Sequence, residues 1–337
     1  MNITIVTDAW KPQVNGVVRN YESLTKVFTE RGNKVTFISP LDFMTIPCPT
    51  YPEISLAMFP KRKLVKLLEA SNPERIHIAT EGPLGWAARK YCVQEGLPFS
   101  TCYHTKFPEY LYERFKFPLD WSYGLMRKFH EPAKTTLINT DGVYDELTLR
   151  RFNHLRKRRM GVDGTIFQQG EKDVLKHLPR PIFVCHGRIA VEKNLEAFLN
   201  LDLPGTKLVI GPGPLLPTLK RKYPDVVFTG YVPDDEMAKL LAASDVMVFP
   251  SFTETFGLVQ LEAMACGLPV AALPVTGPNE IIGNSGAGVL DNDLKKAAMA
   301  ALDIDGDFCR KHALTYKWED GADDFLGALQ PLKEEAA

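Results

Sequence analysis

Short apolar runs alternate with amphipathic stretches along the whole chain, and this pattern is typical of an α/β protein. Each run is rich in Ile, Val, Leu or Thr and is bounded by Gly, Pro, Asn or Asp, as buried strands are. Helical patterns lie between the runs, for example at Gly16–Arg31 and Phe256–Cys266. Apolar strands that alternate with helices favour parallel sheets covered on both faces. The predicted strands are Ile3–Asp8, Lys34–Ser39, Arg75–Thr80, Phe99–His104, Thr135–Thr140, Arg159–Val162, Pro181–His186, Lys207–Gly211, Val226–Gly230, Val246–Pro250, Pro269–Leu273 and Gly288–Leu290.

The chain is long enough for two domains. Its 337 residues exceed a single average core, and the periodic pattern lapses between Gly164 and Arg180. We therefore predict an N-terminal domain over residues 1–165 and a C-terminal domain over residues 178–312. Residues 313–337 are predicted to form a helix that crosses back to the first domain. The predicted fold class is α/β, with two Rossmann-like, doubly wound parallel-sheet domains that face each other across a cleft.

Composition narrows the class of protein. The sequence is 45% hydrophobic and 24% charged, which excludes a disordered or fibrous chain. No apolar run is long enough for a membrane span, and the first eight residues resemble a strand more than a signal peptide. The six cysteines form no C-x-x-C pair and no zinc spacing. We expect a reducing, cytoplasmic compartment.

Charge is divided unevenly between the two halves of the sequence. Residues 1–170 hold 24 Lys and Arg against 17 Asp and Glu, whereas residues 171–337 hold 16 against 24. Basic clusters occur at residues 61–66 and 150–159, and an aromatic-rich stretch with further cations occupies residues 107–129. Such mixtures suit the headgroup level of an anionic membrane, so peripheral contact at the inner face of a membrane is expected. The acidic second half and the lack of any nucleic-acid motif argue against nucleic acid as a partner.

Two cations follow the first strand of the second half. Arg188 and Lys193 lie in the segment GRIAVEKN over residues 187–194, where a Gly permits a tight turn before the next helix. Helix N-termini attract anions, and Arg and Lys add charge-assisted hydrogen bonds to phosphate oxygens. The alternative is a pair of surface cations in a loop. A second tight turn, GPGP over residues 211–214, follows the next strand.

Two carboxylates follow the strand that ends at Pro250. Glu254 is expected in the loop at the strand end, and Glu262 about two turns into the following helix. Eight residues of helix span about 12 Å, so the two acids cannot share one proton or one metal, but they could bind the two ends of an extended ligand. The alternative is one capping and one solvated glutamate, although Glu262 has apolar neighbours. The D-x-D patterns at residues 291–293 and 303–307 are interpreted as solvated turns.

These segments, in this order, resemble the GT-B glycosyltransferases of family 4, which are retaining enzymes with nucleotide-sugar donors. The resemblance rests on residues 187–194, 211–214, 230–234 and 254–270. In the first half, residues 8–19 and 103–110 are similar to the branch of lipid and phosphatidylinositol mannosyltransferases and glycolipid synthases. The resemblance to the family therefore covers nearly the whole chain.

The resemblance implies roles for individual residues. Arg188 and Lys193 match the pair that binds the donor diphosphate as it leaves, and Glu254 matches the acid that holds hydroxyls of the donor sugar. His104 matches a histidine that contacts the donor sugar, although without the resemblance it would be interpreted as a packed core histidine. The remaining matches are to residues of the N-terminal loop and the tight turns, and to residues that contact the base, the phosphates and the ribose of the donor. These donor-binding matches are Gly16, Gly187, Gly213, Tyr231, Val232, Phe256, Gly257, Leu258 and Glu262.

The resemblance also implies a reaction. We expect transfer of a hexose, mannose from GDP-mannose, to a hydroxyl of a lipid or glycolipid, with retention by a front-side route in which the leaving phosphate accepts the acceptor's proton. UDP-glucose, UDP-glucuronate or a UDP-sulfosugar as donor, with diacylglycerol as acceptor, stays open. No cofactor and no metal are expected, because protein cations replace the metal in this fold. Two alternatives of other classes are a GT-B-type sugar-nucleotide epimerase and a non-catalytic nucleotide-sugar-binding protein.

Overall fold

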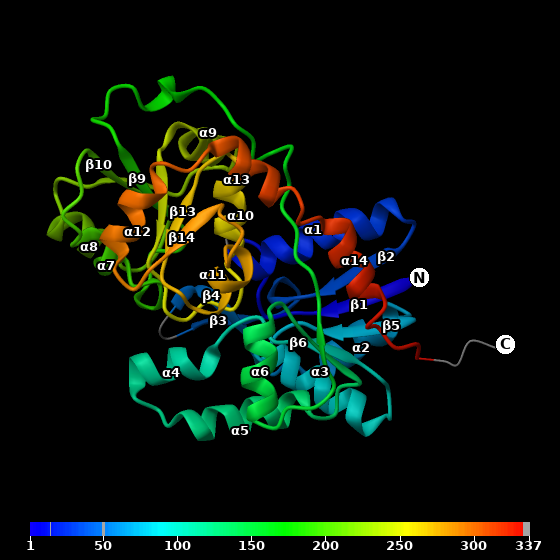
Figure 1. Cartoon of the computed structure of the whole chain (residues 1–337). Coiled ribbons are helices and arrows are strands. Elements are labelled where there is room, and N and C mark those ends of the chain that lie inside the picture. Colours follow the sequence, from blue (N-terminus) through cyan, green and yellow to red (C-terminus); the bar gives the residue numbers. More distant parts are fainter. Residues whose placement is uncertain (14, 49–50, 333–337) are drawn as a thin grey trace. The chain divides into compact units, whose positions relative to one another are not determined.

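The chain forms two compact units, which a computed structural model describes over residues 1–13, 15–48 and 51–332 (Figure 1). Unit 1 consists of Met1–Arg159 together with Trp318–Ala337, and unit 2 is Met160–Lys317. Each unit contains one six-stranded sheet in which every pairing is parallel. The predicted α/β class with two parallel-sheet domains is confirmed. The last five residues of the predicted C-terminal segment, 333–337, lie outside the described part.

The sheet of unit 1 has the strand order β2-β1-β5-β6-β7-β8. A separate antiparallel pair, β3 and β4, follows the first two strands. The strands are β1 Asn2–Val6, β2 Lys34–Ile38, β3 Thr45–Cys48, β4 Tyr51–Ala57, β5 Arg75–Ile78, β6 Ser100–Cys102, β7 Thr135–Ile138 and β8 Leu155–Lys157. The helices are α1 Gly16–Glu30, the 3-10 helix η1 Pro40–Asp42, α2 Lys61–Ala70, α3 Pro83–Gln94, α4 Phe107–Phe115, α5 Leu119–His130, α6 Asp141–Leu149 and α14 Trp318–Leu326.

The sheet of unit 2 has the strand order β11-β10-β9-β12-β13-β14, which is the doubly wound order of dinucleotide-binding folds. Its strands are β9 Ile182–His186, β10 Thr206–Ile210, β11 Val227–Gly230, β12 Val246–Phe249, β13 Val270–Ala272 and β14 Gly288–Leu290. Its helices are the 3-10 helices η2 Lys172–Leu175 and η3 Val191–Lys193, with α7 Leu195–Leu199, α8 Leu216–Lys222, α9 Asp234–Ala243, α10 Leu258–Ala265, α11 Thr276–Ile281, α12 Leu294–Ala301 and α13 Gly306–Ala313. Over residues 1–13, 15–48 and 51–332, no helix combines the length and apolar character needed to cross a membrane.

Burial explains why the strands have near-continuous apolar sequences. Every residue of β9 is buried, because helices cover both faces of the sheet and neither face needs polar residues. The core of unit 2 packs Phe183 and Phe198 with residues of β12 and α12. In unit 1, side chains such as Ile78 and Phe99 pack with α2 and α3. The sheets are therefore the rigid supports of the loops at their edges.

One predicted strand is wrong and one strand pair was not predicted. The strand expected at Arg159–Val162 is absent, and β8 lies a few residues earlier, at Leu155–Lys157. The N–H of Arg158 still donates to Ile138 O at 2.8 Å, but the chain then leaves unit 1. The cluster of cations here hid β8, because its sequence Leu-Arg-Lys lacks the apolar run of a central strand. β3 and β4 form an antiparallel hairpin, which an alternating α/β pattern does not predict.

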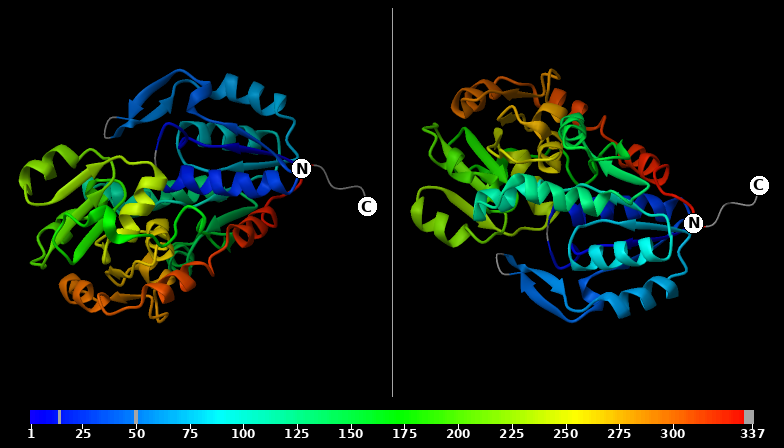
Figure 2. Two further views of the ribbon diagram at one scale, coloured as in Figure 1. Left: turned by 90° about the horizontal axis from the view of Figure 1, so that it is seen from above. Right: turned by 90° about the horizontal axis from the view of Figure 1, so that it is seen from below.

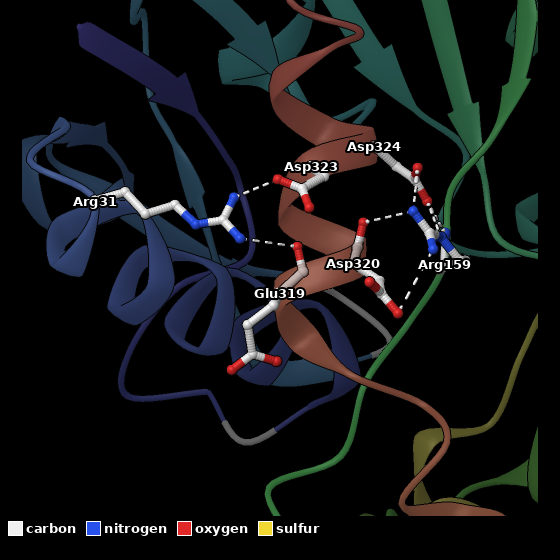
Figure 3. A network of polar contacts seen from close by, with 6 residues as sticks. All are labelled: Arg31, Arg159, Glu319, Asp320, Asp323 and Asp324. Atoms are coloured by element: carbon white, nitrogen blue, oxygen red, sulfur yellow. Dashed lines mark hydrogen bonds and ion pairs between the residues drawn. The ribbon is translucent and has the colours of Figure 1, made fainter.

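The helix α14 returns to unit 1 and packs beside α1 (Figures 1 and 2). Its Phe325 is buried, with its ring centroid 5.3 Å from that of Phe28. Ion pairs flank this contact: Arg31 Nη1 is 2.5 Å from Asp323 Oδ1, and Arg159 Nε is 2.8 Å from Asp324 Oδ2 (Figure 3). The helix is thus attached by an apolar centre and an ionic rim.

The position of α14 changes the charge balance inferred from the sequence halves. This acidic helix carries Glu319, Asp320, Asp323 and Asp324, and it lies against basic residues of unit 1. Counted by unit, the sequence has 25 Lys and Arg against 22 Asp and Glu in unit 1, and 15 against 19 in unit 2. Unit 1 is therefore only slightly basic, although residues 1–170 are strongly so, because the acidic α14 belongs to unit 1.

Candidate functional site

In unit 2, the strand order reverses between β9 and β12, which is where doubly wound sheets bind ligands at the carboxyl ends of their strands. Gly187 and Arg188 follow β9 directly, and Glu254 follows β12 in the loop at its end. The fold joins these two loops, because Lys193 Nζ lies 2.5 Å from Glu254 Oε2. Residues separated by about sixty positions thus form one charged pair at the expected place.

Arg188 is held by a glutamate that the sequence analysis did not single out. Its Nη2 lies 2.9 Å from Glu192 Oε1, and the Glu192 side chain is almost completely buried. Glu192 lies in η3, four residues after Arg188, so the pair forms within a single turn. Its position between the two cations was the available signal, since a buried acid requires a cationic partner.

Two polar contacts fasten the loop after β9 to the loop after β12. Asn194 adopts the left-handed conformation, with φ +50°, and its Nδ2 donates to Pro250 O at 3.0 Å. Ser251 Oγ donates to Glu192 O at 3.2 Å. Both side chains use backbone carbonyls of the other loop, so the spacing between Arg188, Lys193 and Glu254 is fixed by the fold.

The helix α10 begins at Leu258, two residues later than predicted. Its N-cap Gly257 has φ +87°, and a Cβ there would lie 2.5 Å from Gln260 Nε2 and 3.1 Å from Glu254 Cγ. Only glycine accepts this backbone without strain. Phe256 is buried, while Gly257 and Leu258 are partly exposed. Glu262 consequently lies about one turn into the helix, not two.

Glu262 is buried beside a histidine. Its Oε2 lies 3.4 Å from Nε2 of His186, the last residue of β9, and both side chains are nearly inaccessible. His186 Nε2 is also 3.2 Å from Val259 O. The interpretation of Glu262 as a solvated glutamate is therefore wrong.

The other expected donor-binding residues of unit 2 lie at the same edge of the sheet. Gly213 follows β10; its φ is +157°, and a Cβ there would lie 2.3 Å from Ile189 O, so the turn packs directly on the loop after β9. Tyr231 and Val232 follow β11, and the ring of Tyr231 is exposed. The loops after β9, β10, β11 and β12, together with the first five residues of α10, therefore carry every site residue expected in unit 2.

In unit 1, Gly16 and His104 also follow strand ends. Gly16 is exposed and is the first residue of α1, whose N-cap Asn15 accepts hydrogen bonds from the N–H groups of Val17 and Val18 at 3.0 Å. His104 comes two residues after β6 and is partly buried. Burial lowers the pKa of His104 to about 3, with a further lowering by the charge of Arg158. The imidazole is therefore neutral at physiological pH.

A buried aspartate occupies the point where the sheet order of unit 1 reverses. Asp8 follows β1, and its carboxylate accepts hydrogen bonds from Leu84 N at 2.8 Å, Gly85 N at 3.2 Å and Thr80 Oγ1 at 3.0 Å. Burial raises the pKa of Asp8 to about 6. These contacts fix the first turn of α3 against the end of β1, which is a structural role.

The D-x-D patterns are helix caps. The Asp293 side chain accepts from the N–H groups of Lys295 and Lys296 at the start of α12, and Asp305 accepts from Asp307 N at the start of α13. Among the described residues, no group of three or more His, Cys, Asp or Glu is arranged to hold a metal ion.

Comparison with known protein families gives matches in both units. The profile described as Glycosyltransferase Family 4 matches residues 14–162, and the profile described as Glycosyl transferases group 1 matches residues 180–304. Together they span most of the chain and include every expected site residue.

Three curated relatives have similar identity. A sulfoquinovosyl transferase of Arabidopsis thaliana is 28% identical over 80% of this chain, but the match spans only 58% of that protein. A GDP-mannose-dependent alpha-mannosyltransferase of Mycolicibacterium smegmatis is 27% identical over 92% of this chain and 86% of its own. An alpha-monoglucosyldiacylglycerol synthase of Streptococcus pneumoniae is 28% identical over 96% of this chain and 83% of its own.

Among solved structures, a sucrose-phosphate synthase from Thermosynechococcus elongatus superposes with a TM-score of 0.78. It covers 96% of this chain and 97% of that chain at 21% identity. At this identity the likeness concerns the arrangement of the backbone, and it extends through both units.

Proposed function

Because this chain belongs to the GT-B glycosyltransferases of family 4, we propose that it is a retaining hexosyltransferase that uses a nucleotide sugar and a lipid or glycolipid hydroxyl. The observation that carries the proposal is the pair of cations at the reversal point of unit 2, Arg188 with Glu192 and Lys193 with Glu254. Two fixed cations beside a sugar-binding carboxylate suit a donor whose diphosphate leaves with growing negative charge.

The diphosphate binds Arg188 and Lys193. Both cations lie in the segment between β9 and α7, next to the loop that leads to the start of α10. The first N–H groups of a helix attract anions, so α10 adds a second source of positive potential. A donor phosphate that contacts Lys193 competes with Glu254 for its ammonium group, and Glu254 then turns its oxygens to the hydroxyls of the sugar.

The remaining donor contacts are assigned by the resemblance to the family. Tyr231 and Val232 lie along the base, and Glu262 accepts hydrogen bonds from the ribose hydroxyls. Its neighbour His186 orients the carboxylate, since the two side chains are 3.4 Å apart. Gly16 approaches the β-phosphate, and His104 contacts the donor sugar.

The reaction exchanges one C–O bond for another on the same face of the sugar. The bond from the anomeric carbon to the β-phosphate oxygen breaks, and a bond to the acceptor oxygen forms. The acceptor's proton passes to the departing phosphate oxygen, so no protein base is required. Arg188 and Lys193 stabilise the leaving group, and no metal ion is needed for that step.

We propose mannose from GDP-mannose as the transferred sugar, because the M. smegmatis relative that matches most of the chain uses that donor. The names of the plant and pneumococcal relatives favour sulfoquinovose and glucose instead. A donor panel decides between them. The protein is incubated with GDP-mannose, UDP-glucose, UDP-glucuronate or a UDP-sulfosugar, with and without vesicles that contain phosphatidylinositol or diacylglycerol, and release of nucleoside diphosphate is measured.

We expect release from GDP-mannose that increases when lipid is present. Glu254→Gln should lower the rate about 10- to 150-fold, because it removes the charge that strengthens the hydrogen bonds to the sugar hydroxyls. Glu196→Gln is the matched control, because Glu196 pairs with Lys222 in the same unit but on its exposed surface. An epimerised sugar released without acceptor, or binding without turnover, would contradict the proposal.

We also propose that unit 1 contacts an anionic membrane through α2 and the hairpin before it. Lys61, Arg62 and Lys63 are exposed in the first turn of α2, while Leu64 faces the core. Phe59, next to them, is 88% exposed. Each cation close to an anionic leaflet contributes about 1 kcal/mol. Figure 2 shows the hairpin and α2 side by side at one margin of unit 1.

The second basic cluster of the sequence does not support this contact. Arg158 is completely buried, Arg159 pairs with Asp320 and Asp324, and Lys157 Nζ lies 2.8 Å from Asp141 Oδ1. These cations are engaged within unit 1. The membrane contact therefore depends on the local surface at α2 and not on the net charge of a domain.

Flotation with vesicles of phosphatidylglycerol and phosphatidylcholine tests the surface. Replacing Lys61, Arg62 and Lys63 with Gln should abolish flotation at low salt. The matched control replaces Lys220, Arg221 and Lys222, an exposed run of the same composition in unit 2. Equal loss in both triple variants, or none in either, would contradict contact through α2.

A further inference from the structure

A single phenol connects two buried histidines behind the expected sugar contact. The hydroxyl of Tyr21 lies 2.8 Å from His104 Nε2 and 2.7 Å from His77 Nε2. On its far side, His77 Nδ1 lies 2.8 Å from Ser100 Oγ. Tyr21, His77 and Ser100 are all completely buried, and their hydrogen bonds form a chain that runs from the core to His104, whose Nδ1 lies 3.6 Å from Cys102 Sγ.

The chain couples the tautomers of the two histidines. A phenol has one proton, so Tyr21 can donate to only one of the two Nε2 atoms. The other Nε2 must carry a proton and donate to the phenolic oxygen. Consequently one ring is protonated at Nε2 and the other at Nδ1, provided that both rings are neutral. Burial lowers the pKa of His77 well below its usual value and that of His104 to about 3, and it raises the pKa of Tyr21.

Several elements hold the chain in place. Tyr21 comes from α1, His77 from β5 and Ser100 from β6. The rings of Tyr21 and His104 meet edge to face, with centroids 5.3 Å apart. Phe325 of α14 packs against the other side, with its centroid 4.7 Å from that of His77. Neither Tyr21 nor His77 can change rotamer without moving a core neighbour.

We propose that Tyr21 is a positioning residue for His104, and that His77 sets the direction of the hydrogen bond through which Tyr21 acts. The chain fixes both the orientation and the tautomer of the imidazole that meets the donor sugar. This inference rests on the proposed role of His104 in the transfer reaction. It assigns a catalytic consequence to two residues that make no contact with substrate themselves.

Kinetics of matched variants test the positioning role, with turnover measured on the nucleotide sugar that the wild-type protein uses in the donor panel. Tyr21→Phe keeps the ring and removes the shared hydroxyl; kcat should fall by up to about 100-fold, as small misplacements of a reacting contact do, while KM for the donor stays within about twofold. Tyr91→Phe is the control, because the Tyr91 hydroxyl donates to Glu69, which lies on the surface.

A conservative change at His77 separates the hydrogen bond from packing. His77→Gln places an amide group where the ring Nε2 lies and should retain most of the activity. His77→Phe fills the space without a polar atom and should resemble Tyr21→Phe. Equal loss in the Gln and Phe variants, or full activity of Tyr21→Phe, would overturn the positioning role.

Nitrogen-15 NMR of the histidine rings provides a readout that does not depend on activity. In the wild-type protein, His77 and His104 should be neutral and opposite in tautomer, and Tyr21→Phe should abolish this relation. The same tautomer in both rings of an active enzyme would overturn the inference and leave the proposed function intact. Opposite tautomers in a protein that transfers no sugar would instead contradict the proposed function.

Discussion

Arg188 and Lys193 each contact a carboxylate, and this arrangement restricts two long side chains. Ordering an Arg or Lys side chain costs about 1.5–2 kcal/mol of conformational entropy. In this protein the fold already orders both cations in part, because their carboxylate partners are themselves held in place. Glu192 is buried, and Glu254 lies close to the left-handed turn at Gly257. Such preorganisation strengthens binding of a diphosphate without any additional contact.

Gly257 provides a test of that arrangement. Gly257→Ala forces a Cβ into a left-handed backbone and to within 3.1 Å of Glu254 Cγ, so we expect a loss of about 1–3 kcal/mol in the free energy of unfolding. The donor should also bind more weakly, because Glu254 is displaced. Calorimetry and nucleotide titration measure the two effects.

Gly124→Ala is the control for this substitution. Gly124 lies inside α5, and a Cβ there meets no atom within 4 Å. Alanine is favoured over glycine in a helix by about 1 kcal/mol, so this variant should be slightly more stable than the wild type. Similar destabilisation by both substitutions would contradict the argument from strain.

The buried histidines also determine how stability depends on pH. Their folded-state pKa values lie below the unfolded value of 6.5, so below pH 6.5 the unfolded chain binds protons that the folded chain does not. The stability that each contributes is present above pH 6.5 and is lost as pH falls, at up to about 1.4 kcal/mol per pH unit. Asp8 acts oppositely, because its raised pKa adds stability as pH falls below 6.

His77→Gln isolates one of these contributions. The variant lacks the histidine that titrates in the unfolded state, so its unfolding free energy should fall less between pH 7 and pH 5 than that of the wild type. Asp8 and His104 are unchanged and cancel in the comparison. Denaturant titrations at several pH values measure the difference, and parallel curves would show that the pKa of His77 is the same in the folded and unfolded states.

At the scale of elements, sequence reasoning succeeded where burial alone determines the pattern. All six strands of unit 2 were predicted within about two residues, because each is a short apolar or β-branched run and most are bounded by Gly or Pro. It failed at β8, an edge strand whose sequence Leu-Arg-Lys is no more apolar than a loop. The start of α10 was placed too early because Phe256 is buried without being helical.

The residues of the candidate site also fall into those that the sequence predicted and those that it did not. The expected residues of unit 2 all lie at the carboxyl ends of strands, because short motifs there depend on local turns that sequence shows directly. Glu192 was not singled out although its place between two cations was a signal. His186, Tyr21 and His77 were missed because a buried polar residue in an apolar strand or helix has no local signature. Only the tertiary fold shows which partner satisfies it.

The helix α14 offers a prediction at this scale. Phe325→Ala removes a completely buried ring and should lower the free energy of unfolding by about 3–5 kcal/mol. Arg31→Gln removes one partly exposed ion pair of the network in Figure 3 and should cost less than about 1 kcal/mol. Chemical denaturation measures both. Equal losses of stability in the two variants would contradict the view that the buried Phe325 holds the helix more firmly than the ion pair of Arg31.

At the scale of the whole molecule, the donor should affect the two units differently. We expect GDP or UDP to slow hydrogen exchange in the loops after β9, β10, β11 and β12, because all of them carry expected donor contacts. In unit 1, protection by GDP or UDP should be confined to the start of α1, because His104 is assigned to the donor sugar, which these nucleotides lack. Strong protection elsewhere in unit 1 without change in unit 2 would contradict the assignment of the nucleotide site.

The return of α14 to unit 1 also has a consequence for biosynthesis. Unit 2 is one uninterrupted stretch, Met160–Lys317, whereas unit 1 is assembled from segments on either side of it. On the ribosome, unit 2 therefore has its full complement of residues before Phe325 has been synthesised. The helix α1 is synthesised before unit 2, but its partner α14 is synthesised only after it, so Phe28 lacks the cover of Phe325 while unit 2 is being made.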